Sequence, residues 1–285
     1  MSSQEFFQVF LYWSNWDYKL NLVFLAVGML YIWLTGPFRH RFKDAESVSG
    51  WKKISFLIGL ILYYFALGSP LNLMAHELFS MHMLQMSFLY FVVPPLLLLG
   101  MPAYLLRPVV SIKGLQSVIR FFTKPLITLF FFNGAMTFYH VPVVFDTIMK
   151  EPVWHYVSHG LLLFAALCMW WPIVAPLPDW DRIKPIHKLG LIFADGFLLT
   201  PACAMITFTD SVLFKDYMDM SQMFPIMSPI HDQQLGGVIM KIMQEIVYIT
   251  AIGLVFLKWI RQERVKDEAE LREWQQQNNM KLKES

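Results

Sequence analysis

The sequence has few charged residues and almost no cysteine. Asp, Glu, Lys and Arg make up 15% of the 285 residues, whereas soluble domains carry about 25%. With 56% hydrophobic residues and a mean hydropathy of +0.46, the composition excludes an ordinary soluble domain and indicates an integral membrane protein. The net charge of +2 comes from short loops and a tail, so the chain has no continuous basic patch of the kind that binds nucleic acid.

The shortage of cysteine excludes a disulfide framework. The two cysteines, Cys168 and Cys203, both fall in apolar runs and at different predicted depths in a membrane, so they cannot pair. The N-terminus also lacks basic residues before Lys19, and therefore lacks the basic region of a cleaved signal peptide. We expect the first apolar segment to be retained.

Seven apolar runs approach the length of about 20 residues that a transmembrane helix needs. They cover residues 20–35, 54–69, 78–101, 125–141, 153–175, 189–208 and 235–259. Basic residues cluster in alternate connections and in the tail, while the other connections hold only Lys19, Lys150 and Lys215. The positive-inside rule then predicts an all-α, polytopic membrane protein, a bundle of seven transmembrane helices with the N-terminus outside and the C-terminus cytoplasmic. Residues 1–260 form the transmembrane domain, and the charged segment 261–285 is a solvated helix or a frayed cytoplasmic tail.

Histidine and methionine are concentrated in the outer half of this predicted bundle. Six of the eight histidines lie there: His76, His82, His140, His155, His159 and His231. Thirteen of the eighteen methionines have the same distribution. Imidazole and thioether together are a copper-type ligand set, and thioethers favour Cu(I) because both partners are soft. The alternative is that the methionines only fill gaps in the core.

Three of these histidines are predicted to share one depth. With a rise of about 1.5 Å per residue, His82 lies about a turn inside the third run, His140 at the outer end of the fourth, and His159 about a turn inside the fifth. Met86 shares a helical face with His82. We therefore expect a Cu(I) site formed by His82, His140 and His159, with Met86 as a fourth or weak ligand. A hydrogen-bonded histidine cluster that stabilises helix packing is the alternative.

Further candidates surround the predicted site. Four residues could serve as secondary ligands: His76, His155, His231 and Asp232. Asp232 or Gln233 could also hold the second ring nitrogen of a ligating histidine. The last exterior connection, residues 209–237, is rich in methionine and aspartate: Met218, Met220, Met223, Met227, Asp210, Asp216, Asp219 and Asp232. Its acidity would attract a cation, although a solvated loop without a ligand is equally consistent with this composition.

Three ionisable residues fall inside predicted spans, where a charge is costly and is usually paired or functional. Lys241 and Glu245 are one helical turn apart and can neutralise each other. We expect a structural pair, with proton or ion movement as the alternative. Asp195 has no local partner, so we expect a cross-helix hydrogen bond or a protonated carboxyl.

Several short motifs, taken in order, resemble a known family. They are His82-Met83 with Gln85, Pro94-Pro95 followed by Gly100-Met101-Pro102, His140 with Pro142 and Asp146, His159, Trp171-Pro172, and Asp232-Gln233-Gln234 before Gly236-Gly237. Together they resemble the seven-span CtaG family of cytochrome c oxidase assembly factors, which serve caa3-type oxidases. The resemblance marks His82, His140 and His159 as candidate ligands, although relatives often carry a second histidine where this chain has Met86.

The resemblance also implies a function. It implies a multi-pass protein of the bacterial plasma membrane that is needed to form active caa3-type oxidase. Its role would be that of a metallochaperone that binds or delivers copper at the outer face, with oxidase subunits or other assembly factors as partners. It would not be an enzyme, and the sequence itself has no nucleophile, phosphate-loop or paired-carboxylate pattern in a suitable context.

Two other functions remain open from the residues alone. A membrane b-type cytochrome or quinone oxidoreductase could use His82 with His140 or His159 as axial haem ligands. A metal-ion transporter could use the ionisable residues inside the spans. The excess of methionine favours copper over haem. The scarcity of histidine and methionine in the inner half argues against a transport path.

Overall fold

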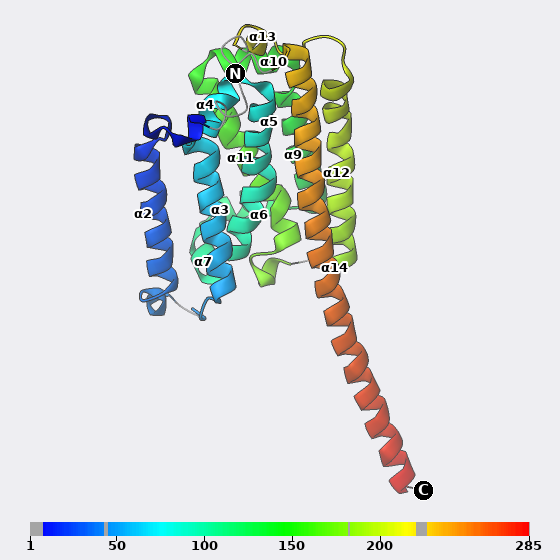
Figure 1. Ribbon diagram of the computed structural model, residues 1–285. Coiled ribbons are helices and arrows are strands. Elements are labelled where there is room, and N and C mark those ends of the chain that lie inside the picture. Colours follow the sequence, from blue (N-terminus) through cyan, green and yellow to red (C-terminus); the bar gives the residue numbers. More distant parts are fainter. Residues whose placement is uncertain (1–7, 43–44, 182, 221–226, 285) are drawn as a thin grey trace.

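The protein is an all-helical bundle (Figure 1). The computed structural model describes residues 8–42, 45–181, 183–220 and 227–284. Within these ranges every regular element is a helix, and no strand is present. The predicted all-α fold class is therefore confirmed.

Among the described residues, six helices are long and apolar enough to cross a membrane. They are α2 (Tyr18–Thr35), α3 (Gly50–Gly68), α5 (Phe79–Ser87) continued by η4 (Phe88–Val92) and α6 (Val93–Gly100), α11 (Pro152–Val174), α12 (Pro185–Phe208) and α14 (Pro229–Glu284). A seventh crossing depends on α9 (Pro125–Tyr139), which is shorter and follows α8 (Leu115–Phe122) at a bend of 80°. If this bent pair is one span, the bundle has the seven spans that the sequence predicts. The orientation of the termini stays a prediction.

Short helices gather at one end of the bundle, which we call the α10 end (Figure 1). They are α4 (Pro70–Glu77), α10 (Pro142–Lys150) and α13 (Lys215–Met220). At the other end, the tail end, α14 leaves the bundle as one uninterrupted helix (Figure 1). The segment expected to be a solvated helix or a frayed tail is helical up to Glu284. The α10 end is the end that the basic residues predict to face outside.

Capping residues and prolines set several helix ends. The Asp17 side chain accepts hydrogen bonds from two backbone N–H groups in the first turn of α2. Proline occupies the first turn of α9, α10, α11 and α12, where a missing N–H is tolerated. Pro94 and Pro95 follow the π-helical turn η4, so the third span continues through them with a local change of helix type. Such π-turns are rare and occur frequently at functional sites.

Two glycines let α14 approach its neighbours closely. A Cβ atom at Gly236 would lie 2.6 Å from the ring of Phe79 on α5. A Cβ at Gly237 would collide with Thr207 on α12. A larger side chain at either position would push the helices apart. Gly236 therefore sets how closely α14 approaches α5, the helix that carries His82, and Gly237 sets how closely it approaches α12.

A histidine cluster at the α10 end

Five of the six outer histidines come together at the α10 end. His76 lies on α4, His82 on α5, His140 directly after α9, and His155 and His159 on α11. Three pairs of rings are neighbours. Ring centroids are 5.4 Å apart for His76 and His155, 4.4 Å for His155 and His159, and 6.2 Å for His159 and His82. We call these five residues the histidine cluster. The predicted agreement in depth is thus realised as a contact between His82 and His159.

Tyr139 connects His140 to the other rings. Its ring centroid lies 5.1 Å from that of His140 and 6.0 Å from those of His82 and His159. His140 and His82 also both contact the ring of Phe145 on α10. The three predicted primary ligands therefore all contact the ring of Tyr139.

The hydrogen bonds of His140 define its tautomer. Nδ1 lies 2.8 Å from the backbone oxygen of Met136. Because a carbonyl oxygen can only accept, Nδ1 carries the proton, and Nε2 of the neutral ring carries a lone pair. This Nε2 is buried and has no hydrogen-bond partner among the described residues. A ring whose Nδ1–H is held by a carbonyl while Nε2 is free has the arrangement of a metal-ligating histidine.

His159 and His82 have similar surroundings. Nδ1 of His159 lies 2.8 Å from the hydroxyl of Tyr90, and its buried Nε2 has no partner within the described parts of the chain. Nε2 of His82 is 3.4 Å from the hydroxyl of Tyr139, which is a long hydrogen bond. A buried polar atom without a partner costs about 1–3 kcal/mol. The two nitrogens belong to rings that both contact Tyr139, and each unpaired buried nitrogen calls for an explanation.

A partly open cavity of about 630 Å³ reaches the cluster from the side of α2 and α3. His76, His155 and His159 line it, together with Tyr90 and Gln85. Gln85 does not offer its amide nitrogen to the cavity, because this atom donates to the carbonyl oxygen of Ala66 at 2.7 Å and to Asn72 at 2.8 Å.

Burial lowers the pKa of His76 below its ordinary value of 6.5, although the neighbouring Glu77 carboxylate opposes this shift. His76 is therefore neutral at pH 7 and has a lone pair available. His76 lies on the short helix α4, outside the apolar spans.

Met86 and His231 do not line the cavity. Met86 is 0% exposed and packs in the hydrophobic core with Met83 and Met136. Its role as a ligand stays a prediction. His231 is exposed in the first turn of α14 and is not among the described residues that line the cavity.

Asp232 has another role, which sequence reasoning missed. Its carboxylate accepts hydrogen bonds from the backbone N–H of Phe79 at 2.6 Å, from the backbone N–H of Ser80 at 3.2 Å, and from the Ser80 hydroxyl. These donors open α5, whose own N-cap residue, Leu78, offers no side-chain acceptor. Asp232 thus caps, from α14, the helix that carries His82. No local pattern could reveal a cap supplied from so far along the chain.

Gln233 and the methionine-rich connection between α12 and α14 form further hydrogen bonds at the α10 end. Gln233 accepts from the backbone N–H of Leu213 at 2.7 Å and so fixes the connection after α12 rather than an imidazole. The hydroxyl of Tyr217 on α13 donates to the carbonyl oxygen of Ala75 on α4 at 2.6 Å. Met223 lies outside the described residues, as do the side chains of Asp219 and Met220.

In the conformation described, the cluster is a set of neighbouring rings and not a closed metal cage. Within the described residues, no three His, Cys, Asp or Glu side chains form a group that could hold a metal ion. Cu(I) is stable with two or three ligands, and imidazole and thioether suit it.

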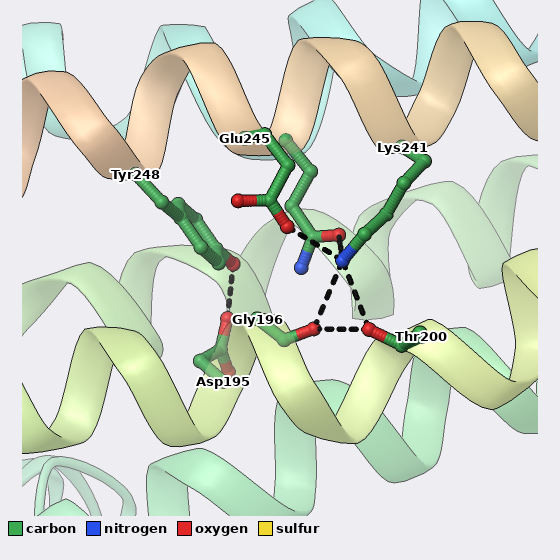
Figure 2. A network of polar contacts seen from close by, with 7 residues as sticks. Asp195, Gly196, Thr200, Lys241, Glu245 and Tyr248 are labelled. Atoms are coloured by element: carbon green, nitrogen blue, oxygen red, sulfur yellow. Dashed lines mark hydrogen bonds and ion pairs between the residues drawn. The ribbon is translucent and has the colours of Figure 1, made fainter.

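A second polar network lies between α12 and α14 (Figure 2). Asp195 is 0% exposed and accepts hydrogen bonds from the hydroxyl of Tyr248 and the side-chain amide of Asn133. These contacts confirm the predicted cross-helix hydrogen bond. Lys241 forms the predicted ion pair with Glu245, with Nζ and a carboxylate oxygen 2.6 Å apart.

Lys241 has further partners on α12. Nζ donates to the Thr200 hydroxyl at 2.9 Å and to the carbonyl oxygen of Gly196 at 3.3 Å (Figure 2). Each charged group of this network therefore has a partner within it, which is the pattern of a structural network.

The fold and the cluster define a polytopic helical membrane protein with histidines gathered beneath one end of its bundle. The family described as cytochrome c oxidase caa3 assembly factor (Caa3_CtaG) matches residues 29–262, and the chain belongs to this family. The matched region contains the whole histidine cluster. The resemblance noted in the sequence is thereby confirmed.

Curated relatives occur in mycobacteria. The uncharacterized protein ML1998 of Mycobacterium leprae is 24% identical over 227 residues, which cover 74% of this chain and 34% of that protein. Mb0105 of Mycobacterium bovis and MT0111 of Mycobacterium tuberculosis, both described as uncharacterized, are 26% identical with the same coverage. The chain thus matches about a third of the length of these relatives. No solved structure gives a significant match.

Proposed function

We propose that the protein supports formation of active caa3-type cytochrome c oxidase by binding Cu(I) at His82, His140 and His159 of the histidine cluster and passing it to an oxidase subunit or another assembly factor. Membership of the assembly-factor family supports the role in oxidase formation. The observation that carries the copper assignment is the pair of buried imidazole nitrogens without a partner, Nε2 of His140 and Nε2 of His159.

The surroundings of these nitrogens fit a soft cation. His140 is held by a backbone carbonyl and His159 by the hydroxyl of Tyr90, so each ring is oriented through Nδ1. His82 lies next to His159 and can supply a third imidazole. All these groups are neutral, so a monovalent ion would add a single positive charge to the site. Met86 is the candidate thioether.

The proposed role requires no catalysis. Copper is cargo that enters and leaves without a change of oxidation state. With the α10 end outside, as the basic residues predict, the site would lie beneath the outer face of the bacterial plasma membrane. This position suits transfer to a copper centre on the outer side.

Binding can be tested on the purified full-length protein in detergent. Anaerobic titration against a coloured Cu(I) chelator should give one tightly bound Cu(I) per chain. His140→Gln and His159→Gln should each weaken binding at least tenfold. His187→Gln, at an exposed histidine in the first turn of α12, is the matched control and should bind as the parent does. Parental affinity in both cluster variants would contradict the proposed site.

The cellular role needs a separate test. A deletion strain grown at limiting copper should lack oxidase activity with cytochrome c as donor while the oxidase subunits are still made. Normal activity in that strain would contradict an assembly role. An absorption spectrum of the purified protein with a Soret band would favour the haem alternative, and metal uptake into proteoliposomes would favour a transporter.

A further inference from the structure

We propose that His76 and His155 form an access pair from which copper passes through His159 to the buried imidazoles of His82 and His140. This inference rests on the proposed copper function and adds a route and a direction to it. The argument uses the order of exposure, the distances between rings and the shape of the cavity.

The exposure of the rings decreases along one path. His76 is exposed, His155 and His159 are half-buried, and His82 and His140 are each 1% exposed. Successive centroids along the first four rings are 5.4, 4.4 and 6.2 Å apart. The histidines therefore form a graded series from the surface to the core, and not a compact site with equal access.

The histidines of this series fall into two groups, those that line the cavity and those that do not. His76, His155 and His159 line it, whereas His82 and His140 are not among the described residues that do so. An ion that enters the cavity meets the access pair before it can reach the buried rings. His159 faces the cavity and contacts His82, so it is placed to connect the two parts.

The ring spacing permits transfer by ligand exchange. A metal–imidazole bond is about 2.0–2.1 Å long, so two rings joined through one ion have centroids about 6 Å apart. The three observed distances lie near or below this value. A new Cu–N bond can therefore form before the old one breaks. Copper remains Cu(I), no electron moves, and each neutral imidazole keeps its proton.

Charge favours the surface end as the point of loading. Glu77, next to His76 in the chain, has a buried carboxylate oxygen, Oε2, that lacks a hydrogen-bond partner in the described structure. A carboxylate beside the first imidazole attracts a cation to the start of the path.

Kinetics can separate the access pair from the final site. Loading is followed by stopped flow, with a Cu(I)–chelator complex as donor and the full-length protein in detergent as acceptor. Unloading is measured with excess chelator. The variant His76→Gln/His155→Gln should load and unload at least tenfold more slowly, while its equilibrium affinity stays within about threefold of the parent. An access residue changes the rate in both directions and leaves the end point unchanged.

His140→Gln, in contrast to the double variant, should lower the equilibrium affinity for Cu(I), mainly through faster unloading. His187→Gln is the control for the number of histidines and should match the parent in both measurements. Thermal unfolding of each variant shows that the fold is retained, and His76→Asn/His155→Asn provides a second pair if the glutamine variant is unstable.

The possible failures differ from one another. If the parent binds no Cu(I), the proposed function itself is wrong. If the parent binds but the double variant loads at the parental rate, the access pair is wrong and the proposed function stands. If the double variant loses affinity in parallel with its rates, His76 and His155 belong to the final site, and the route is overturned.

Discussion

The histidine cluster and the Asp195–Lys241 network are both polar regions inside an apolar bundle, and they differ in how well their groups are paired. In the network every charged group has a partner, and the atoms left over belong to the neutral amides of Asn133 and Gln244. In the cluster, imidazole nitrogens at the centre of the site are left over. The paired groups of the network account for their own burial, whereas the unpaired imidazoles of the cluster are the groups that the proposed Cu(I) site would pair. The comparison predicts that mutations in the network affect stability and mutations in the cluster affect copper.

The largest effect should come from the network. Asp195→Ala leaves the Tyr248 hydroxyl and the Asn133 amide without their acceptor, and each unsatisfied donor costs about 1–3 kcal/mol. We expect the free energy of unfolding in detergent to fall by about 3 kcal/mol. The Cu(I) affinity of the folded protein should not change. Asp195→Asn keeps one acceptor and should lose less. A stable Asp195→Ala variant that no longer binds copper would contradict the division between a structural network and a copper-binding cluster.

Asp232 should affect both properties, because it caps the helix that carries His82. Losing a helix cap costs about 1–2 kcal/mol. Asp232→Ala should therefore lower the free energy of unfolding by this amount and weaken Cu(I) binding as the start of α5 frays. Ser80→Ala removes one of the three donors and should have a smaller effect on both. Denaturation and chelator titration on the same preparations measure the two effects. Weaker copper binding with full stability would instead indicate that Asp232 is a ligand.

Tyr90 should affect copper binding, and because Tyr90→Phe leaves the buried Nδ1 of His159 without its partner, the free energy of unfolding should also fall by about 1 kcal/mol. Tyr90→Phe removes the hydroxyl that orients Nδ1 of His159, and the loss of such a supporting hydrogen bond weakens metal binding about tenfold. This factor corresponds to about 1.4 kcal/mol. Tyr139→Phe removes the longer contact to His82 and should cost less. If the two variants lose Cu(I) affinity equally, or if neither loses any, the result would argue against His159 as a ligand.

Asp146 tests whether an unpaired atom alone marks a binding site. Burial raises the pKa of Asp146 above its ordinary value of 3.8, and the Asp216 carboxylate adds to this shift, while Lys150 and Lys215 oppose it. Since the folded-state pKa is raised, ionisation of Asp146 opposes folding, and the free energy of unfolding falls as pH rises from about 3.8 through the folded pKa.

Asp146→Asn should remove this part of the pH dependence. It should stabilise the protein at pH 7 by no more than about 0.5 kcal/mol, because the carboxyl is partly solvated. Unfolding curves at pH 5 and pH 7 measure this difference. Copper affinity should be unchanged, although Oδ1 of Asp146 is itself a buried atom without a partner in the described part of the chain. A large loss of affinity would extend the metal site to α10.

Much of the architecture follows from composition and spacing. Apolar length predicts the spans, and a fixed helical rise predicts that His82 and His159 meet at one depth. The bend before α9 escaped prediction because it depends on how α8 packs. The sequence did not predict which residues pair with Asp195, because Tyr248 and Asn133 carry no charge and belong to other helices. The cap from Asp232 also depends on tertiary contact, and so does the packing of Met86 within the core.

The most direct test of the copper site is X-ray absorption at the copper edge on Cu(I)-loaded, full-length protein. We predict two or three nitrogen neighbours at about 2.0 Å, with the outer-shell scattering of imidazole rings. In His140→Gln and His159→Gln this imidazole signal should fall by one ring each. A sulfur-only first shell that is unchanged in both variants would place copper on the methionines and contradict the account.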